Sequence, residues 1–294
     1  MLELKNVWKS YRVGALGSKR LVAVRDVSID VAPGEVLSVV GESGSGKTTI
    51  GKMVLQLTSV TRGSITLDGV DVTAKGHAQR KEYYRNVQGV FQDPFSSYNP
   101  IFKADRVFET VRESYFPQVG RQEWREKLER VLQSVRLDPG SVLGKYPHQL
   151  SGGQLQRMLI ARALLLDIKV LVADEIISML DASTRIDVLN LLAELREQGL
   201  GVLFVTHDLS LANYISERVV IMRHGAVVEM GETGKVFSDP RHPYSRNLLA
   251  SVPQLHRKWS DDPVEPEPLE PDGDREIDPP PLTKVGDGHW AATG

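Results

Sequence analysis

One short segment constrains the fold more than any other part of this chain. Residues 41–49 read Gly41-Glu-Ser-Gly-Ser-Gly-Lys-Thr-Thr49 and fit the pattern G-x-x-x-x-G-K-[ST]. The apolar run Glu35–Val40 before them predicts a buried strand, and the apolar spacing of residues 47–57 predicts a helix. A glycine-rich loop between a strand and a helix lets backbone N–H groups surround phosphate oxygens at the positive end of the helix dipole. The segment therefore predicts a nucleotide phosphate site in an α/β fold.

The residue types of this loop indicate separate tasks. The glycines allow the backbone to turn inward, Lys47 is suited to neutralise the β- and γ-phosphates, and the Thr48 hydroxyl is suited to ligate Mg²⁺. The predicted nucleotide-binding residues are Gly41, Ser43, Gly44, Ser45, Gly46, Lys47, Thr48 and Thr49. The alternative is a glycine–serine turn that matches by accident, which the flanking strand and helix argue against. The loop alone does not separate transporters from kinases, GTPases or repair ATPases.

Strand and helix patterns alternate again in the second half of the chain. Strands are expected over 169–173, 201–206 and 219–222, and helices over 184–198 and 209–216. This order predicts a mostly parallel central sheet, with the helical region of about 105–165 as an insertion.

Two further segments contain candidate residues for binding Mg²⁺ or phosphate and for activating water. Asp174 and Glu175 end the strand of residues 169–173, where Asp174 could hold Mg²⁺ and Glu175 could polarise an attacking water. A strand that simply ends in acidic surface residues is an equally good reading of that pair alone. Leu150-Ser-Gly-Gly-Gln154 stands before a predicted helix and could complete a phosphate site that another segment supplies.

In this order, the motifs resemble those of the ATP-binding cassette (ABC) ATPases, whose signature is LSGGQ. The resemblance implies an α/β P-loop NTPase (RecA-like) core, an antiparallel β subdomain and an inserted helical signature subdomain. It implies an ATPase domain over 1–250, with the core at about 1–95 and 166–235 and the helical subdomain at about 96–165. Residues 251–294 would be an acidic, proline-rich extension.

The resemblance also assigns roles to residues that mean little alone. Gln92 matches the glutamine that senses Mg²⁺ and nucleotide, and His207 matches the switch histidine at the γ-phosphate. Tyr11 falls where the family stacks an aromatic ring on adenine, although a strand tyrosine is often only a packing residue. The implied site residues are Glu175, His207, Lys47 and Gln92 for catalysis, Tyr11 and Ser151, Gly152, Gly153 and Gln154 for nucleotide, and Thr48, Gln92 and Asp174 for the metal.

One departure from the family pattern follows Glu175. The family usually continues Pro-Thr-Ser, whereas this chain has Ile176-Ile177-Ser178. Two β-branched residues replace a proline and a polar residue, so the geometry of the loop comes into question while the base stays intact.

Sequences outside the ATPase motifs point to a branch of the family. Phe91-Gln-Asp-Pro94, Ser97-Tyr-Asn-Pro100 and Asp239-Pro-Arg-His-Pro-Tyr244 look like the oligopeptide/dipeptide importer branch. A generic amphipathic C-terminal helix is the alternative for the last of these. The branch implies a second ATPase subunit, identical or not, two integral membrane subunits and an extracytoplasmic solute-binding protein, at the cytoplasmic face of the membrane. Oligosaccharide or nickel import, a soluble non-transport ABC ATPase and a regulatory subunit without turnover remain alternatives.

The charge distribution agrees with such a protein. The net charge is -2, but residues 261–294 hold ten acidic and two basic residues, which leaves 28 acidic and 34 basic residues in 1–260. A mildly basic body suits nucleotide phosphates and requires no nucleic acid. The composition of the tail favours a flexible, solvated extension, although Pro279–Leu282 and Gly288–Trp290 are apolar enough to dock on this chain or on a partner.

Overall fold

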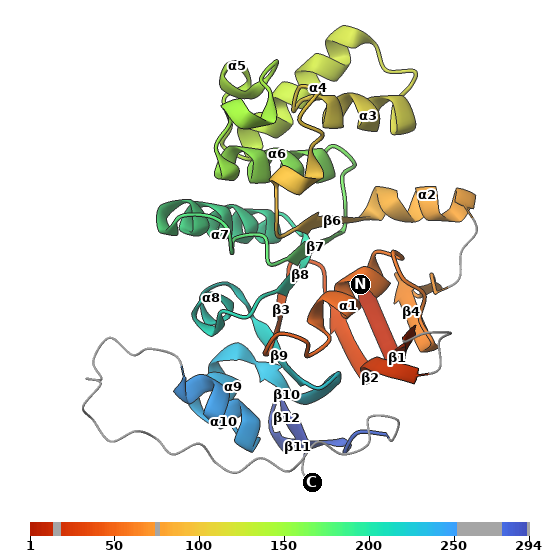
Figure 1. The fold of residues 1–294 in the computed structure, drawn as a ribbon, viewed down its shortest axis with the longest axis vertical. Helices are drawn as coiled ribbons and strands as arrows, with labels where there is room; N and C mark the ends of the chain where they lie inside the picture. Colours follow the sequence, from red (N-terminus) through yellow and green to blue (C-terminus); the bar gives the residue numbers. More distant parts are fainter. Residues whose placement is uncertain (14–18, 74–76, 252–277, 293–294) are drawn as a thin grey trace. The chain divides into compact units, whose positions relative to one another are not determined.

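The computed structural model describes residues 1–13, 19–73, 77–251 and 278–292. These residues divide into two compact units, residues 1–75 with 203–294 and residues 76–202. Figure 1 labels most of their helices and strands. Among the described residues, no helix combines the length and the apolar character needed to cross a bilayer.

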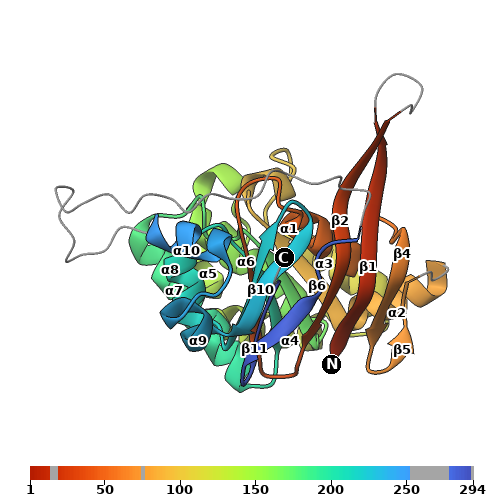
Figure 2. The same cartoon turned by 90° about the horizontal axis from the view of Figure 1, so that it is seen from below.

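The first unit begins with an antiparallel sheet in the order β2-β1-β4-β5. Its strands are β1 (Leu2–Val13), β2 (Lys19–Val31), β4 (Arg62–Leu67) and β5 (Val70–Asp71). β1 pairs with both β2 and β4, and the long β1–β2 pair is plain in Figure 2. Residues 19–31 thus form one continuous strand of a predicted antiparallel β subdomain.

The same unit contains a second run of hydrogen-bonded strands in the order β11-β12-β10-β9-β3. They are β3 (Val36–Val40), β9 (Arg218–Arg223), β10 (Ala226–Glu232), β11 (Leu282–Gly286) and β12 (His289–Ala292). β3 and β9 are parallel, while the pairs β9–β10, β10–β12 and β11–β12 are antiparallel. The parallel pair therefore continues into an antiparallel extension.

The described residues of this unit form the helices α1 (Lys47–Val54), α8 (Leu209–Ile215), α9 (Thr233–Ser238) and α10 (Pro243–Ala250). Side chains of α8, α9 and α10 pack with those of β3, β9 and β10 in one buried cluster that includes Val40, Val219 and Tyr244. This cluster packs the C-terminal helices against β3, the strand that leads into the predicted phosphate loop, and against β9 and β10.

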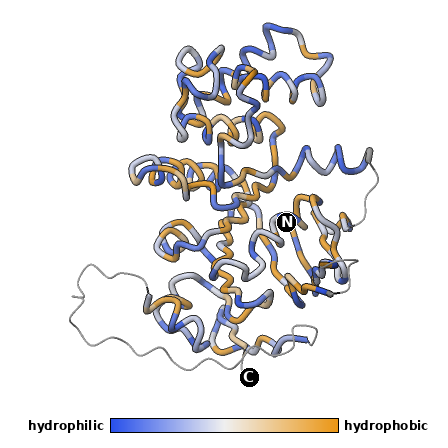
Figure 3. Tube along the Cα trace, viewed as in Figure 1, coloured by the Kyte–Doolittle hydropathy of each residue, from blue (hydrophilic) through white to orange (hydrophobic). Residues whose placement is uncertain are grey.

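The second unit is mainly helical. It contains α2 (His77–Asn86), α3 (Arg106–Tyr115), α4 (Arg121–Ser134), α5 (Pro139–Val142), α6 (Gly152–Leu164) and α7 (Ala182–Glu197), with 3₁₀ turns at Phe95–Ser97 and Pro147–Gln149. Its strands β6 (Val87–Phe91) and β7 (Val170–Asp174) are parallel. β8 (Gly201–Val205) spans the residues where the two units meet in sequence. Figure 3 shows apolar colour along the strands and hydrophilic colour along exposed helices such as α2.

These elements confirm the α/β class with parallel strand pairs and an antiparallel sheet. The expectation of a solvated tail is wrong for residues 282–292, and the alternative, that Gly288–Trp290 docks on this chain, is confirmed. Residues 282–292 form the hairpin β11–β12, and β12 extends the sheet by pairing Ala291, Trp290 and His289 with Glu229, Met230 and Gly231. Backbone hydrogen bonds to the edge of β10, together with burial of His289 and Ala291, hold this segment on the chain. The rest of the acidic tail lies outside the described residues.

Candidate functional site

The predicted phosphate loop connects β3 to α1 with the geometry that its glycines require. Gly41, Gly44 and Gly46 have φ values of 147°, 81° and 106°, in the left-handed region. A Cβ on Gly41 would lie 2.3 Å from the Met222 carbonyl oxygen, and one on Gly46 would lie 2.5 Å from the Ala23 carbonyl oxygen. These two positions therefore exclude a side chain on steric grounds as well as on backbone conformation.

Lys47 begins α1 and folds back over its own loop. Its Nζ donates to the carbonyl oxygens of Gly41 at 2.7 Å and Glu42 at 2.8 Å. The side chain is buried, so the ammonium is held by backbone dipoles at the start of the helix. Thr48, the predicted metal ligand, is exposed in the first turn of α1. The loop thus places a cation and a hydroxyl beside the positive end of a helix dipole, which suits bound phosphate.

His207 lies at the carboxyl end of β8, in the same unit as the phosphate loop. The preceding Thr206 donates its N–H to the carbonyl of Val39, the penultimate residue of β3, at 3.2 Å. Asp208 caps α8 by accepting from the N–H groups of Ser210 and Leu211. Bonds on both sides therefore hold the exposed His207 in a short, fixed turn beside the strand that leads into the loop.

Tyr11 belongs to β1, opposite Leu21 of β2, and its ring is partly exposed. The Nζ of Lys9 lies 4.9 Å from the ring centroid and also donates to the Ser59 carbonyl oxygen at 2.6 Å. A planar ring with an exposed part and a neighbouring cation could accept a stacked base.

In the second unit, the acidic pair ends β7 as the sequence predicts. Asp174 is buried, and Glu175 is partly exposed with φ 51°, a left-handed conformation that costs a non-glycine residue about 1–3 kcal/mol. The Ser178 N–H donates to the Glu175 carbonyl at 3.1 Å, and the Ser178 hydroxyl donates to it at 2.9 Å. The bend after β7 therefore turns Glu175 out of the strand direction while Asp174 continues it.

The structure gives a physical reason for the unusual Ile176-Ile177 pair. Both side chains are almost completely buried. The two side chains therefore contribute apolar packing at the position where the family has a proline and a polar residue. Arg185 adds hydrogen bonds to the carbonyls of Leu180 and Ser178, which close the following loop.

The Ser151–Gln154 loop forms a capping box at the start of α6. The Ser151 hydroxyl accepts from the Gln154 N–H at 3.1 Å, and Gln154 Oε1 accepts from the Ser151 N–H at 2.9 Å. A Cβ on Gly153 would lie 2.3 Å from Thr184 Cγ2, so α6 and α7 meet closely at this glycine. The N-terminus of α6 thus has the positive end of a helix dipole but no lysine in its first turn, as the sequence indicates.

Gln92 follows β6 and is exposed. The next residues are ordered by Asp93, whose carboxylate accepts from the Phe95 N–H at 2.9 Å. Gln156 of α6 is buried, and its Nε2 lies 3.4 Å from the Phe91 carbonyl oxygen at the end of β6. The sequence by itself assigns no role to this residue. A polar residue in the apolar stripe of α6 is the signal that could have found it.

Comparison with known proteins identifies the family of this chain. Residues 24–178 match the model of the ABC transporter family. The chain belongs to the ABC transporter family. Residues 228–274 also match the oligopeptide/dipeptide transporter C-terminal region, which here begins in β10 and includes α9 and α10. These matches confirm the family resemblance and the assignment as an ABC ATPase.

Individual relatives of this ABC ATPase extend the match over most of its length. It is 38% identical to the oligopeptide transport ATP-binding protein AmiF of Streptococcus pneumoniae over 99% of this chain and 94% of that protein. It is 40% identical to OppF of Streptococcus pyogenes serotype M1, an oligopeptide transport ATP-binding protein, over 81% of this chain and 78% of that protein. A dimeric post-hydrolysis structure of the ATP-binding cassette MJ0796, bound to ADP and Pi, aligns with a TM-score of 0.71 at 30% identity, covering 79% of this chain and 99% of that one.

Proposed function

We propose that this ABC ATPase is the ATP-binding and hydrolysing subunit of an importer for oligopeptides or dipeptides. The observation that carries the proposal is the region from β10 to α10, which matches the C-terminal region of that transporter branch and follows the predicted ATPase motifs. The names of the relatives AmiF and OppF support the same reading.

For ATP binding, we assign the phosphates to the loop of residues 41–49. Lys47 neutralises the β- and γ-phosphates, the loop amides and the α1 dipole orient them, and Tyr11 stacks on the adenine. The second phosphate-facing segment, Ser151–Gln154, would come from a second ATPase subunit, because its helix N-terminus lacks a cation of its own. The dimeric structure of the relative MJ0796 supports such an assembly.

For hydrolysis, Glu175 is the proposed base. Water attacks the γ-phosphorus, its proton passes toward the Glu175 carboxylate, and the bond from the γ-phosphorus to the β–γ bridging oxygen breaks. His207 donates to the γ-phosphate oxygens as charge develops on them, and Gln92 senses the nucleotide and its Mg²⁺. The stable turns that hold Glu175 and His207 support these roles.

The residues also suit a magnesium ion. The Thr48 hydroxyl, the Asp174 carboxylate and the Gln92 amide are hard oxygen donors, which Mg²⁺ prefers over nitrogen or sulfur. When bound with ATP, Mg²⁺ would neutralise charge on the β- and γ-phosphate oxygens.

The partners follow from the same proposal. Two integral membrane subunits would convert ATP-driven closure into transport, and an extracytoplasmic solute-binding protein would deliver the solute, with the ATPase at the cytoplasmic face. The basic body of residues 1–260 needs no nucleic-acid partner.

Reconstitution tests the function directly. The chain would be co-expressed with a second ATPase subunit and two membrane subunits of an oligopeptide importer, placed in liposomes and assayed for ATP hydrolysis with the corresponding solute-binding protein. Stimulation by peptides, and not by oligosaccharides or nickel, is expected. Hydrolysis by a chain that never co-purifies with membrane subunits would instead favour the soluble, non-transport alternative.

A further inference from the structure

The start of α10 is built from His242, Pro243 and Tyr244, and each residue has a structural task. His242 is the N-cap, with Nδ1 accepting from the Tyr244 N–H at 3.0 Å. Pro243 occupies the first helical position, where its missing N–H costs no intrahelical bond. The cap and the proline together fix the direction in which the Tyr244 side chain leaves the helix.

Tyr244 reaches the phosphate loop across 202 residues of sequence. Its ring lies in the buried cluster with Val40 and Val219, and only 3% of the residue is exposed. Its hydroxyl accepts a hydrogen bond from the Glu42 N–H at 3.2 Å. Burial raises the pKa of this hydroxyl, so it stays protonated and neutral. The contact therefore joins α10 to the second residue of the loop.

The group that Tyr244 binds is the same peptide unit that holds Lys47. The Gly41 carbonyl, which accepts from Lys47 Nζ at 2.7 Å, and the Glu42 N–H, which donates to Tyr244, belong to one peptide group. In a trans peptide the C=O and the N–H point in opposite directions. Tyr244 and Lys47 thus form hydrogen bonds to opposite sides of the Gly41–Glu42 peptide. Rotation of that peptide would break both hydrogen bonds.

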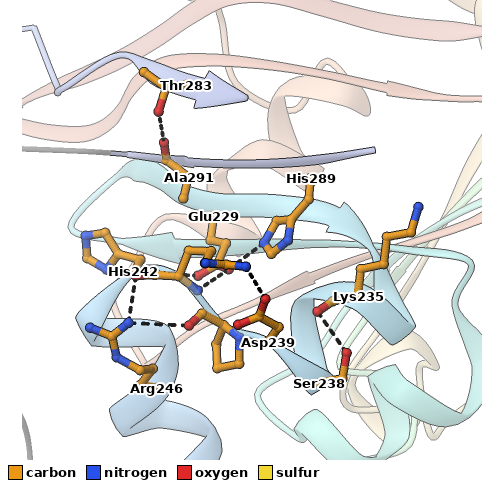
Figure 4. A network of polar contacts seen from close by, with 11 residues as sticks. Glu229, Lys235, Ser238, Asp239, His242, Arg246, Thr283, His289 and Ala291 are labelled. Carbon is orange, nitrogen blue, oxygen red and sulfur yellow. Dashed lines mark hydrogen bonds and ion pairs between the residues drawn. The ribbon is translucent and has the colours of Figure 1, made fainter. Parts of the chain in front are cut away.

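The base of α10 is tied in turn to the C-terminal hairpin. The buried Glu229 carboxylate of β10 accepts from the N–H groups of Arg241 and His242 at 2.8 and 2.9 Å. Its Oε1 also lies 2.7 Å from Nε2 of His289 in β12. Figure 4 shows Glu229 between the residues that lead into α10 and His289 of the hairpin. A continuous chain of polar contacts therefore runs from β12 through Glu229 and α10 to the phosphate loop.

We propose that Tyr244 is a positioning residue for ATP binding: it fixes the Gly41–Glu42 peptide and thereby the ammonium of Lys47. The proposal rests on the proposed role of Lys47 at the phosphates. Without the tyrosine hydroxyl, the loop samples other orientations of this peptide, and the apparent affinity falls with the population of the competent one. Once ATP is bound, its phosphates hold the loop themselves, so the chemical step is little affected.

The test is the substitution Tyr244→Phe, which keeps the ring in the core and removes only the hydroxyl. The expected result is about a three- to tenfold rise in the Kd for MgATP by calorimetry on the full chain, the scale of one neutral hydrogen bond. In the complex with its membrane subunits, KM for ATP should rise by a similar factor while kcat stays within about twofold of wild type.

The matched control is Ser245→Ala on the same helix. Ser245 Oγ is buried, and the structure shows no hydrogen-bond partner for it among the described residues. This variant should leave Kd and KM unchanged. An unchanged Kd in Tyr244→Phe, an equal rise in Ser245→Ala, or a loss confined to kcat would each overturn the positioning role.

A third variant separates the two proposals. Lys47→Ala should abolish measurable ATP binding if Lys47 holds the phosphates. Retained binding in that variant overturns the role of Lys47 and with it the reason for the Tyr244 effect. Lost binding in Lys47→Ala together with unchanged binding in Tyr244→Phe overturns the Tyr244 proposal alone.

Discussion

The Glu229 carboxylate lies 2.7 Å from the imidazole Nε2 of His289, and both side chains are buried. The two residues are 60 positions apart in sequence and stand on paired strands, β10 and β12. Because the same carboxylate also accepts two backbone N–H groups before α10, it joins the C-terminal hairpin, the sheet and the last helix.

Removal of this carboxylate should therefore be costly. Glu229→Ala leaves two backbone N–H groups and the His289 ring without their acceptor, and we expect a loss of about 3 kcal/mol in the free energy of unfolding. Urea denaturation followed by circular dichroism measures it. The control is Glu232→Ala. Glu232 is exposed and pairs with Lys235, so its removal should change the free energy of unfolding by less than about 0.5 kcal/mol. Equal losses in the two variants would contradict the role of Glu229.

Glu175→Gln tests the proposed base. The amide keeps the shape of the side chain but cannot take the proton of the attacking water, so ATP hydrolysis should fall about 100-fold or more. MgATP binding should persist, because the residue takes no part in holding the phosphates. Turnover in the assembled complex and calorimetry on the chain give the two values.

The matched control is Glu197→Gln at the end of α7, where the carboxylate is exposed and pairs with Arg196. Near-normal turnover in Glu175→Gln would exclude this residue as the base.

The close approach of α6 and α7 at Gly153 makes a specific steric prediction. Gly153→Ala places a Cβ 2.3 Å from Thr184 Cγ2, and the resulting strain should destabilise the chain by about 1–3 kcal/mol. Gly152→Ala should be much milder, since its nearest neighbour, Leu180 Cδ2, would lie at 3.5 Å.

A second substitution should rescue the first. Thr184→Ser removes the colliding methyl group and keeps the hydroxyl that donates to Asp181 Oδ2 at 2.7 Å. In the double variant, most of the stability lost in Gly153→Ala should return, as measured by thermal unfolding. Additive losses would show that the Thr184 methyl group is not the cause.

The cap of α10 should make stability depend on pH. Burial lowers the pKa of His242 below its usual value, with Arg223 and Arg246 acting in the same direction and Glu229 opposing them. The neutral ring is also the form whose Nδ1 can accept the Tyr244 N–H. Because the folded-state pKa lies below the unfolded value of about 6.5, this contribution is fully present above that pH. It is lost as the pH falls through the folded-state pKa.

His242→Asn isolates this effect, because asparagine can cap a helix and does not titrate. Between pH 7 and pH 5, the melting temperature of the wild type should fall further than that of this variant. This is roughly the window in which an ordinary histidine gains its proton. Parallel pH profiles of the two proteins would show that the cap does not titrate.

Much of the site is predictable because its signals are local. The glycines of residues 41–46 specify backbone angles, the apolar spacing after Lys47 specifies a helix, and a buried strand that ends in Asp174 specifies where the carboxylates emerge. Each of these depends on neighbours within a few residues, which the sequence lists directly.

Other features depend on contacts that are distant in sequence. The composition of residues 261–294 averages an acidic stretch with a short apolar end, so it indicates solvent exposure where the structure has a paired strand. Likewise, the sequence leaves open the loop geometry after Glu175, and only the tertiary structure shows that the side chains of Ile176 and Ile177 are buried there.

The sequence alone thus predicted the family, from the order of its motifs, and the α/β class and the conformation of the glycine-rich loop, from local backbone and side-chain chemistry. The tertiary structure decided which residues stabilise that loop. Tyr244 and Glu42, 202 positions apart, meet only because α10 packs on the strands that carry the loop. His289 reaches Glu229 only because β10 offers an edge on which β12 can form hydrogen bonds.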